Sequence, residues 1–377
     1  MTPVTRPNSS AEQAEPASGA EPGARGGSET SSAELVIRAA TASDDGAIEL
    51  FVRDEPGAVF QRPGWRRAVQ RVFRHQVRDL VALRGDQLVG LLPLMRCPRV
   101  TGGAHWISTP YGVYGGPLTS ELEVRRALVA SALQGAREER VGRLELRSRE
   151  ALDCEGLTPS DLYVTFVKDL PTEREDVLKS IRKDERRLIR RARDTHGLVL
   201  EEGRWFVEDL ARLFRESKQR LGSPGLPVEW FRALLEELGE EVVIHIVRRP
   251  GEVLAASMCF IDGDELRMYY IGTTETANRS YAATSFMIAE LQEWAVERGL
   301  KRFDLGRSRR DAGAVKFKRN QGFEAAPLHY SYGLVRSRGL PSFTPSNPRT
   351  ARLRQIWAKL PATVCERLSR RLARYLP

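Results

Sequence analysis

The sequence contains few residues of the kinds that build disulfide or metal frameworks. It has 4 cysteines and 5 histidines in 377 residues, and neither set contains a pair at metal-ligand spacing. Cysteines this few and this scattered argue against a disulfide-stapled secreted module and against a zinc site. We therefore expect a protein of a reducing compartment that holds no metal.

Long apolar segments are also missing. No stretch approaches about 18 uninterrupted apolar residues, and the first residues lack the basic start, apolar run and cleavage site of a secretory signal. These absences predict a cytoplasmic protein. Residues 1–34 hold almost no large apolar side chain, which predicts a disordered tail because such a segment buries too little surface to offset its ordering entropy.

Positive charge is also not spread evenly along the chain, as it would be in a general nucleic-acid binder. The net charge is +9, but residues 346–377 carry +7, residues 179–193 carry +6 and residues 1–34 carry −3, so the remainder is nearly neutral. DNA binding is therefore not expected. The basic helix expected at 179–193 either follows the phosphates of tRNA or of a nucleotide-linked lipid, or is a solvated surface.

The chain is long enough for two domains, and the order of its elements repeats. In the first half we expect strands at 35–40, 79–84, 87–95 and 143–147, and helices at 42–52, 65–75 and 122–137. In the second half we expect helices at 173–194, 205–219, 228–238 and 278–298, and strands at 241–247, 252–261, 265–272 and 301–306. We divide the chain into a tail at 1–34, domains at 35–168 and 169–340, and a basic C-terminal segment at 341–377.

Each half is expected to form a mixed α/β sheet. A strand followed by a crossover helix and another strand gives a parallel pair at the centre of the sheet. Such a sheet places its working site at the carboxyl ends of the central strands. In the second half these ends carry Ile271-Gly-Thr-Thr and Asp304-Leu-Gly-Arg-Ser.

Several motifs in order resemble one family. Residues 303–308 read FDLGRS and 313–332 read GAVKFKRNQGFEAAPLHYSY, with YGGPL at 114–118 and LELR at 144–147. Together they resemble FemAB-like proteins, in particular the branch associated with exosortase and exopolysaccharide systems. The chain departs from that branch at Leu305, Ala312 and Gln321.

The resemblance implies two tandem Gcn5-related N-acyltransferase (GNAT) domains that transfer an acyl or aminoacyl group to an amine. Its donor would be an acyl-CoA or an aminoacyl-tRNA. Its acceptor would be a small or lipid-linked amine of cell-envelope or exopolysaccharide assembly. Two alternatives stay open, namely a CoA-dependent N-acetyltransferase acting on a small amine and a non-catalytic, membrane-associated subunit of a polysaccharide assembly system.

The expected catalytic residues follow the central strand of the second half. Amide formation needs a group that takes the amine proton and donors for the oxyanion. Asp304 is the expected base or amine-orienting group, and Arg307 and Ser308 are placed to hold a phosphate or carboxylate. Lys318 is expected to face the same cleft. Alternatively, Asp304 and Arg307 form an ion pair that only fixes the loop, and Lys318 belongs to a solvated face.

A second set of residues is expected to contact substrate. The glycine-rich loop around Tyr111 and Tyr114 suits a rigid turn that presents an aromatic ring to a groove, and the remaining members lie at motif or strand positions of the two halves. The whole set comprises Tyr111, Tyr114, Arg147, Tyr270, Arg279, Lys316 and Tyr332.

The stretch that would bind coenzyme A departs from its usual pattern. CoA-binding members of the fold present free backbone N–H groups at a helix N-terminus, within an Arg/Gln-x-x-Gly-x-Gly/Ala loop. Residues 279–284 keep Arg279 but have Ala282 and Thr284 where glycine and a small residue would stand. The alternative is a plain helix N-terminus capped by Asn278 or Ser280.

The C-terminal segment is a basic amphipathic helix interrupted at Pro361. Its apolar stripe includes Leu353, Ile356 and Trp357, and arginines and lysines occupy the other faces. Such helices bind anionic membrane surfaces, which would make the protein peripheral to the inner face of the cell membrane. The alternative is that the helix docks on the acyltransferase core.

Overall fold

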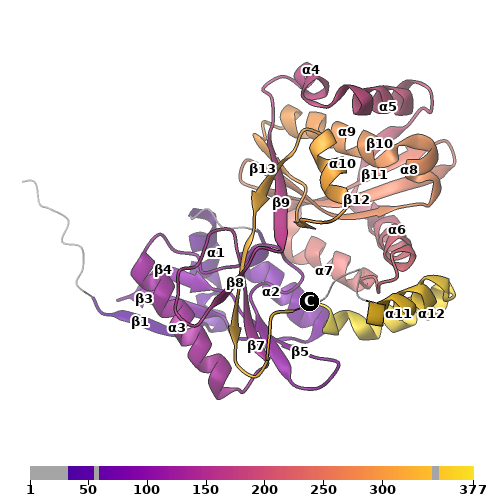
Figure 1. Ribbon diagram of the computed structural model, residues 1–377. Coiled ribbons are helices and arrows are strands. Elements are labelled where there is room, and N and C mark those ends of the chain that lie inside the picture. The colour runs from indigo at the N-terminus through magenta and orange to yellow at the C-terminus, as the bar shows by residue number, and fades with distance from the viewer. Residues whose placement is uncertain (1–32, 55–58, 342–347) are drawn as a thin grey trace, which may run out of the picture.

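The structure is a computed structural model that describes residues 33–54, 59–341 and 348–377. The expected disordered tail therefore lies almost wholly outside the described residues. Two lobes are visible in Figure 1, one built mainly from the first half of the chain and one mainly from the second. No helix in the described ranges is long and apolar enough to cross a membrane.

The first lobe contains two sheets. The three-stranded sheet runs in the order β1 (Leu35–Ala39), β3 (Leu80–Arg84), β4 (Gln87–Leu92). The six-stranded sheet runs in the order β2 (Gln76–Val77), β5 (Met95–Pro98), β6 (Ala104–Ile107), β7 (Arg143–Ser148), β17 (His329–Leu334), β8 (Thr158–Ser160). Its helices are α1 (Asp45–Asp54), α2 (Pro63–Phe73) and α3 (Leu122–Glu138).

The second lobe is built on one eight-stranded sheet. Its strands are β10 (Val199–Glu202), β11 (Val242–Arg249), β12 (Glu252–Asp262), β13 (Glu265–Thr273), β14 (Arg302–Asp304), β9 (Tyr163–Asp169) and β15 (Ser308–Arg309), with β16 (Glu324–Pro327) also paired to β9. Its helices are α4 (Arg174–Val177), α5 (Lys183–Asp194), α6 (Val207–Arg220), α7 (Val228–Leu238), α8 (Thr276–Tyr281), α9 (Ala283–Glu297) and α10 (Ala314–Asn320). Helix α6 packs on β12 and β13, whereas α9 packs on β11, β12 and α5.

Both lobes contain the expected parallel pair. Strands β6 and β7 pair in parallel around α3, and β13 and β14 pair in parallel around α8 and α9. All other strand pairs described are antiparallel, as in β11 with β12. The repeated order of elements in the sequence therefore corresponds to a repeated crossover in the fold.

The two lobes exchange strands across the expected domain boundary. Strand β9 lies almost wholly in the expected first domain but pairs with β14, β15 and β16 in the sheet of the second lobe. Strand β17 lies in the expected second domain but pairs with β7 and β8 in a sheet of the first lobe. Figure 1 shows β9 beside the other strands of the second lobe. A division after residue 168 therefore does not separate the sheets.

Three expected elements are interrupted. The strand expected at 87–95 ends at Leu92, because Pro93 has no N–H to continue a ladder, and β5 continues in the other sheet. The helix expected at 173–194 is split into α4 and α5. The helix expected at 278–298 breaks at Ala282, whose φ of 52° is left-handed. Seven strands were not expected, namely β2, β6, β8, β9, β10, β15 and β16, and most of them are too short to show a period-two pattern.

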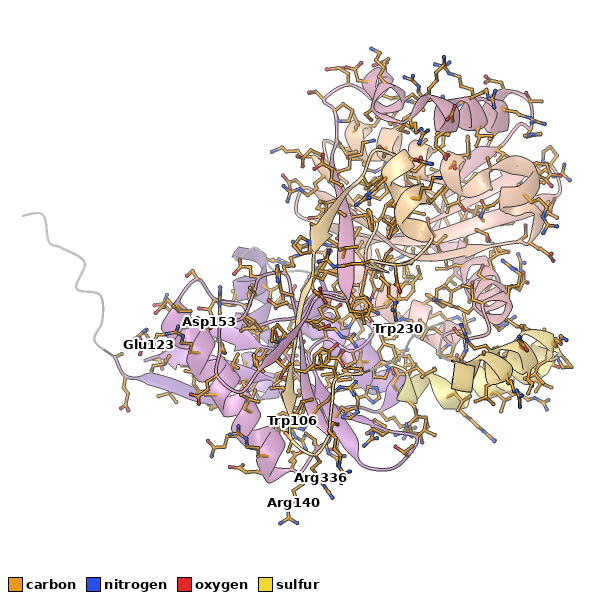
Figure 2. The ribbon with its side chains drawn as sticks, viewed as in Figure 1. Trp106, Glu123, Arg140, Asp153, Trp230 and Arg336 are labelled. Atoms are coloured by element: carbon orange, nitrogen blue, oxygen red, sulfur yellow. The ribbon has the colours of Figure 1, made fainter. Side chains whose placement is uncertain are left out.

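An aromatic core joins the lobes. Trp65 of α2 lies edge-on to Trp230 of α7, with ring centroids 5.2 Å apart, and Phe60 lies 5.9 Å from Phe260 of β12. All four side chains are almost fully buried. Figure 2 shows Trp230 at this junction. Burial of large aromatic area holds the two lobes in one arrangement.

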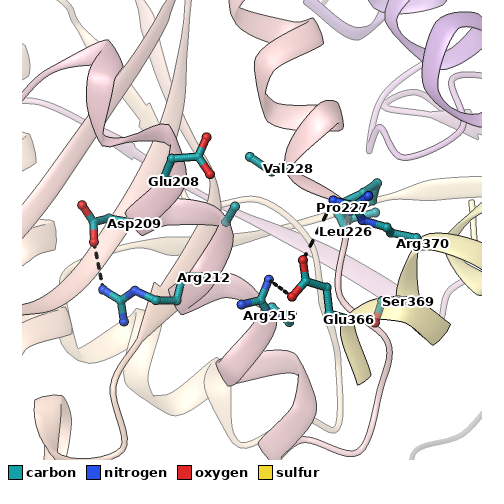
Figure 3. A pocket seen from close by; sticks show the side chains of 11 residues that line it. Glu208, Asp209, Arg212, Arg215, Leu226, Pro227, Val228, Glu366, Ser369 and Arg370 are labelled. Atoms are coloured by element: carbon teal, nitrogen blue, oxygen red, sulfur yellow. Dashed lines mark hydrogen bonds and ion pairs between the residues drawn. The ribbon is translucent and has the colours of Figure 1, made fainter. Parts of the chain in front are cut away.

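The C-terminal segment forms two helices, α11 (Pro348–Lys359) and α12 (Ala362–Leu372), separated at Pro361 as expected. One face of α12 docks on the second lobe, where Cys365 and Ser369 are buried and the Ser369 hydroxyl accepts the Gly225 N–H. Figure 3 shows Glu366 between Arg215 of α6 and Arg370 of α12. Docking on the core is thus observed for this face.

Candidate active site

The loop between β6 and α3 is a part of the first lobe that reaches the site. Thr109 and Tyr111 in this loop have left-handed φ angles of 45° and 64°, an uncommon conformation for side chains of this size. Gly115 lies so close to Thr109 that a Cβ would meet its side chain at 2.1 Å. The loop is therefore tightly folded, and it directs the Tyr114 hydroxyl toward β14 of the second lobe.

Asp304 lies at the end of β14 and is 1% exposed. Its Oδ2 accepts hydrogen bonds from the Tyr114 hydroxyl at 2.5 Å and from Arg267 Nη1 at 3.1 Å. Its Oδ1 accepts from the Thr165 hydroxyl at 2.8 Å and from the Gly306 N–H at 2.7 Å. An ionised carboxylate only accepts hydrogen bonds. With four donors in place, Asp304 is built to position its neighbours, and this geometry does not favour its service as a proton acceptor.

Arg267 balances the charge of Asp304 within a larger buried network. Its guanidinium also lies 2.8 Å from Glu265 and 3.0 Å from Asp262. Burial raises the pKa of Glu265, and the nearby Arg267 opposes that rise. The alternative that Asp304 pairs with Arg307 is wrong, because the buried arginine that contacts Asp304 is Arg267.

Strands β13 and β14 part just beyond this network. Their parallel register ends at Arg267 and Asp304. The Leu305 N–H donates to the Phe166 carbonyl of β9, and the chain then pairs with β9 through β15, away from β13. Gly306 has a φ of 66° at this turn, which favours glycine. From Met268 onward, no strand in the described residues pairs with this edge of β13.

Lys318 of α10 holds the turn where the strands part. Its Nζ donates to the Leu305 carbonyl at 2.7 Å and to the Gly306 carbonyl at 2.9 Å. Burial lowers the pKa of Lys318 to about 8, and the charge of Asp304 partly opposes that shift. Lys318 is therefore bonded to main-chain oxygens near Asp304, and it is not part of a solvated lysine face. Lys316 of the same helix is exposed.

Arg307 faces a different environment from Asp304. Its guanidinium lies over the rings of Tyr163 and Tyr330, at 4.7 and 5.6 Å from their centroids, and donates to the Tyr330 hydroxyl at 3.2 Å. Arg307 is exposed and lines a cavity of about 470 Å³ between the lobes. Arg147 and Tyr332, two of the expected substrate-binding residues, line the same cavity.

Two of the expected substrate-binding tyrosines lie in the aromatic core. Tyr111 stacks on Phe73 with centroids 4.1 Å apart, and its hydroxyl donates to the Ala373 carbonyl. The Tyr270 hydroxyl accepts from Trp230 Nε1 at 2.9 Å. Burial raises the pKa of both tyrosines. The structure gives these side chains packing contacts and does not place them at the cavity.

The remaining expected residues lie apart from the cavity. Arg279 is exposed on α8, and Ser308 is half-buried in β15, opposite Val164. At the start of α9, the Thr284 N–H donates to Asn278 Oδ1 at 2.9 Å, so one amide of the expected CoA-binding turn already has a partner. Asn278 is thus the capping residue at this break.

Residues that the sequence did not reveal complete the site. Thr165 and Tyr163 come from β9, a strand that was not expected. Arg149 lies 4.0 Å above the Tyr114 ring and 3.6 Å from Glu265. Its place two residues after the LELR motif at 144–147 was the one signal available. In the described ranges, no group of three or more His, Cys, Asp or Glu side chains could hold a metal ion.

The parted parallel strands, the crossover helices and the repeated architecture define two tandem GNAT-type acyltransferase domains. Residues 178–319 match the family model described as "Acetyltransferase (GNAT) domain". No curated protein matches the sequence.

Several solved structures share the fold at low sequence identity. FemX is 13% identical over 80% of this chain and 98% of its own, with a TM-score of 0.61. A tandem GNAT protein from the clavulanic acid biosynthesis pathway is 13% identical, with coverage of 82% and 100% and a TM-score of 0.52. L-PGS from Bacillus licheniformis is 12% identical, with coverage of 88% and 97% and a TM-score of 0.51.

Replacing Asp304 with asparagine tests the positioning role. Asp304→Asn keeps the shape of the side chain but removes a buried charge that faces Arg267, so the free energy of unfolding should fall by about 3 kcal/mol. Urea denaturation followed by circular dichroism measures this change. The matched control is Asp311→Asn, which breaks an exposed pair with Arg309 and should leave stability nearly unchanged. Equal stability of the two variants would contradict the role.

The pKa of Lys318 predicts a pH dependence. The folded-state pKa of about 8 lies below the ordinary value of 10.5, so the unfolded chain binds more protons between these pH values and stability should rise with pH there. Lys318→Met removes this dependence. From pH 7.5 to 9.5, the unfolding free energy of the wild type should gain about 2 kcal/mol relative to the variant. A difference that does not change with pH would refute a lowered pKa.

Proposed function

We propose that the protein is a FemAB-like N-acyltransferase or aminoacyltransferase that forms an amide on an amino-bearing precursor of the cell envelope or of an exopolysaccharide. The observation that carries the proposal is the parting of β13 and β14 beyond Arg267 and Asp304. It leaves the main-chain N–H and C=O groups along one edge of β13 without a strand partner, and a donor molecule supplies partners for them.

The proposed reaction forms one bond and breaks another. The neutral amine attacks the donor carbonyl carbon, a C–N bond forms, and the bond to the ester oxygen or thioester sulfur breaks. The amine proton passes to the leaving group. Arg307 holds the anionic part of a substrate, Asp304 positions Tyr114 and Gly306, and Lys318 holds the turn at Leu305 and Gly306.

Aminoacyl-tRNA is the donor we favour over acyl-CoA. A CoA pyrophosphate would need the free amides at the start of α9, where Asn278 occupies the Thr284 N–H and the Ala282 side chain stands at the position usually held by glycine. The exposed arginines of α5, namely Arg187, Arg190 and Arg191, offer a surface for tRNA phosphates.

The donor assignment is tested by supplying two donors to the purified protein. With glucosamine as the amine, aminoacyl-tRNA should yield an aminoacylated product by mass spectrometry, and acetyl-CoA should yield none. Consumption of acetyl-CoA alone would establish the CoA-dependent alternative. Transfer from neither donor would favour the non-catalytic subunit.

Two arginine variants, at positions 302 and 307, test the role of Arg307 in this reaction. Arg307→Ala should lower kcat/KM by about a hundredfold or more, because a charge-assisted contact to the substrate is lost. Arg302→Ala removes the same charge from an exposed pair with Asp169 and should retain full activity. Equal turnover of the two variants would refute the role of Arg307.

We also propose that α11 and α12 bind an anionic membrane surface with their outer faces. Leu353 and Ile356 are 66% and 59% exposed. Arg352, Lys359 and Arg367 are exposed beside them and have no carboxylate partner within the described part of the chain. Apolar side chains among unpaired cations suit the lipid interface better than an RNA backbone.

The membrane proposal predicts binding to vesicles. The protein should sediment with phosphatidylcholine vesicles that contain phosphatidylglycerol and remain in solution with phosphatidylcholine alone. The double variant Leu353→Ser, Ile356→Ser should weaken binding by about tenfold because the apolar contact is lost. The control is Leu50→Ser, an equally exposed leucine of α1. Unchanged vesicle binding by the double variant, or binding to tRNA in its place, would refute the proposal.

A further inference from the structure

The cavity between the lobes carries an excess of positive charge. It is bounded by the six-stranded sheet, by Tyr163 and Arg307, and by residues 375–377. Four arginines line it, namely Arg99, Arg143, Arg147 and Arg307, against two carboxylates, those of Glu145 and of the terminal residue Pro377. Burial, together with the charges of Arg143 and Arg99, lowers the pKa of His105, also in the lining, to about 4. That histidine is therefore neutral near pH 7.

These two carboxylates do not balance the four arginine charges. Glu145 binds Arg143 at 3.0 Å through one oxygen and Arg147 at 3.0 Å through the other. Among the described residues, Arg307 has only the Tyr330 hydroxyl and aromatic rings as partners. Arg147 is 3% exposed, so its charge lies far from bulk water. Charges held in such a place require a compensating anion.

The neighbouring polar groups also suit an anion. Tyr163 and Tyr332 line the cavity. Neither hydroxyl forms a hydrogen bond with any part of the chain that the structure describes. Both are free to donate. Arg147 Nη1 donates to the Gly112 carbonyl at 2.8 Å, and its Nη2 donates at 3.2 Å to an oxygen of the Pro377 carboxyl group. A carboxylate oxygen therefore fits against Nη2.

We propose that this cavity binds a small molecule through an oxyanion, either a phosphate or a carboxylate. Arg307 and Arg147 hold its charge, and Tyr163 and Tyr332 donate hydrogen bonds to its oxygens. A volume of about 470 Å³ lies within the usual range of small-molecule sites and exceeds that of a bare ion. The site does not depend on the reaction proposed above, because binding can be measured without turnover.

The test is isothermal titration of the full chain with inorganic phosphate and, separately, with citrate, at constant ionic strength set by NaCl. The wild type should bind at least one of the two, and the stronger ligand identifies the oxyanion as phosphate or carboxylate. Arg307→Gln should weaken that binding by about tenfold or more. Arg302→Gln, with the same loss of net charge outside the cavity, should bind like the wild type.

A second variant covers the case in which Arg307→Gln fails to fold. Tyr163→Phe removes a hydroxyl without a partner, so circular dichroism should show an unchanged fold while anion binding weakens severalfold. Absence of phosphate and citrate binding by the wild type would overturn the proposal. Equal affinities of Arg307→Gln, Tyr163→Phe and Arg302→Gln would overturn it as well.

Discussion

The buried carboxylate of Asp304 is the constraint on which the rest of the site depends. A charge removed from water must be matched by donors, or the fold is strongly destabilised. Its donors come from separate segments: Tyr114 from the loop after β6, Thr165 from β9 and Arg267 from β13. One group therefore fixes both lobes at the point where β14 ends, and with it the turn at Gly306.

The same segment carries a second polar group that is left open. Arg307 follows Asp304 by three residues, yet it faces aromatic rings and the cavity between the lobes. Hydrogen-bond donors of the protein occupy the Asp304 carboxylate, whereas Arg307 has room for a ligand. The end of β14 can therefore be rigid and still bind a ligand, because Asp304 and Lys318 hold the backbone while Arg307 remains available to a substrate.

The strand exchange makes the cavity a property of both halves together. Tyr163 reaches it because β9 belongs to the second sheet, and Tyr332 reaches it because β17 belongs to the first. The C-terminal helices then add a further surface, with a buried inner face on α12 and an outer face that combines exposed leucine, isoleucine and basic side chains. The proposed substrate site and the proposed membrane surface thus lie on different parts of the molecule.

The sequence by itself determined the two-part α/β architecture, the parallel pair in each half and the break at Pro361. These features follow from local periodicity, turn residues and motif order, which need no knowledge of distant contacts. It did not predict β9 or its pairing, because strand partners are set by hydrogen bonds between segments about 140 residues apart in the chain. For the same reason only the tertiary structure decided that Asp304 contacts Arg267, that Tyr111 and Tyr270 are core residues, and that Arg307, Arg147 and Tyr332 share one cavity.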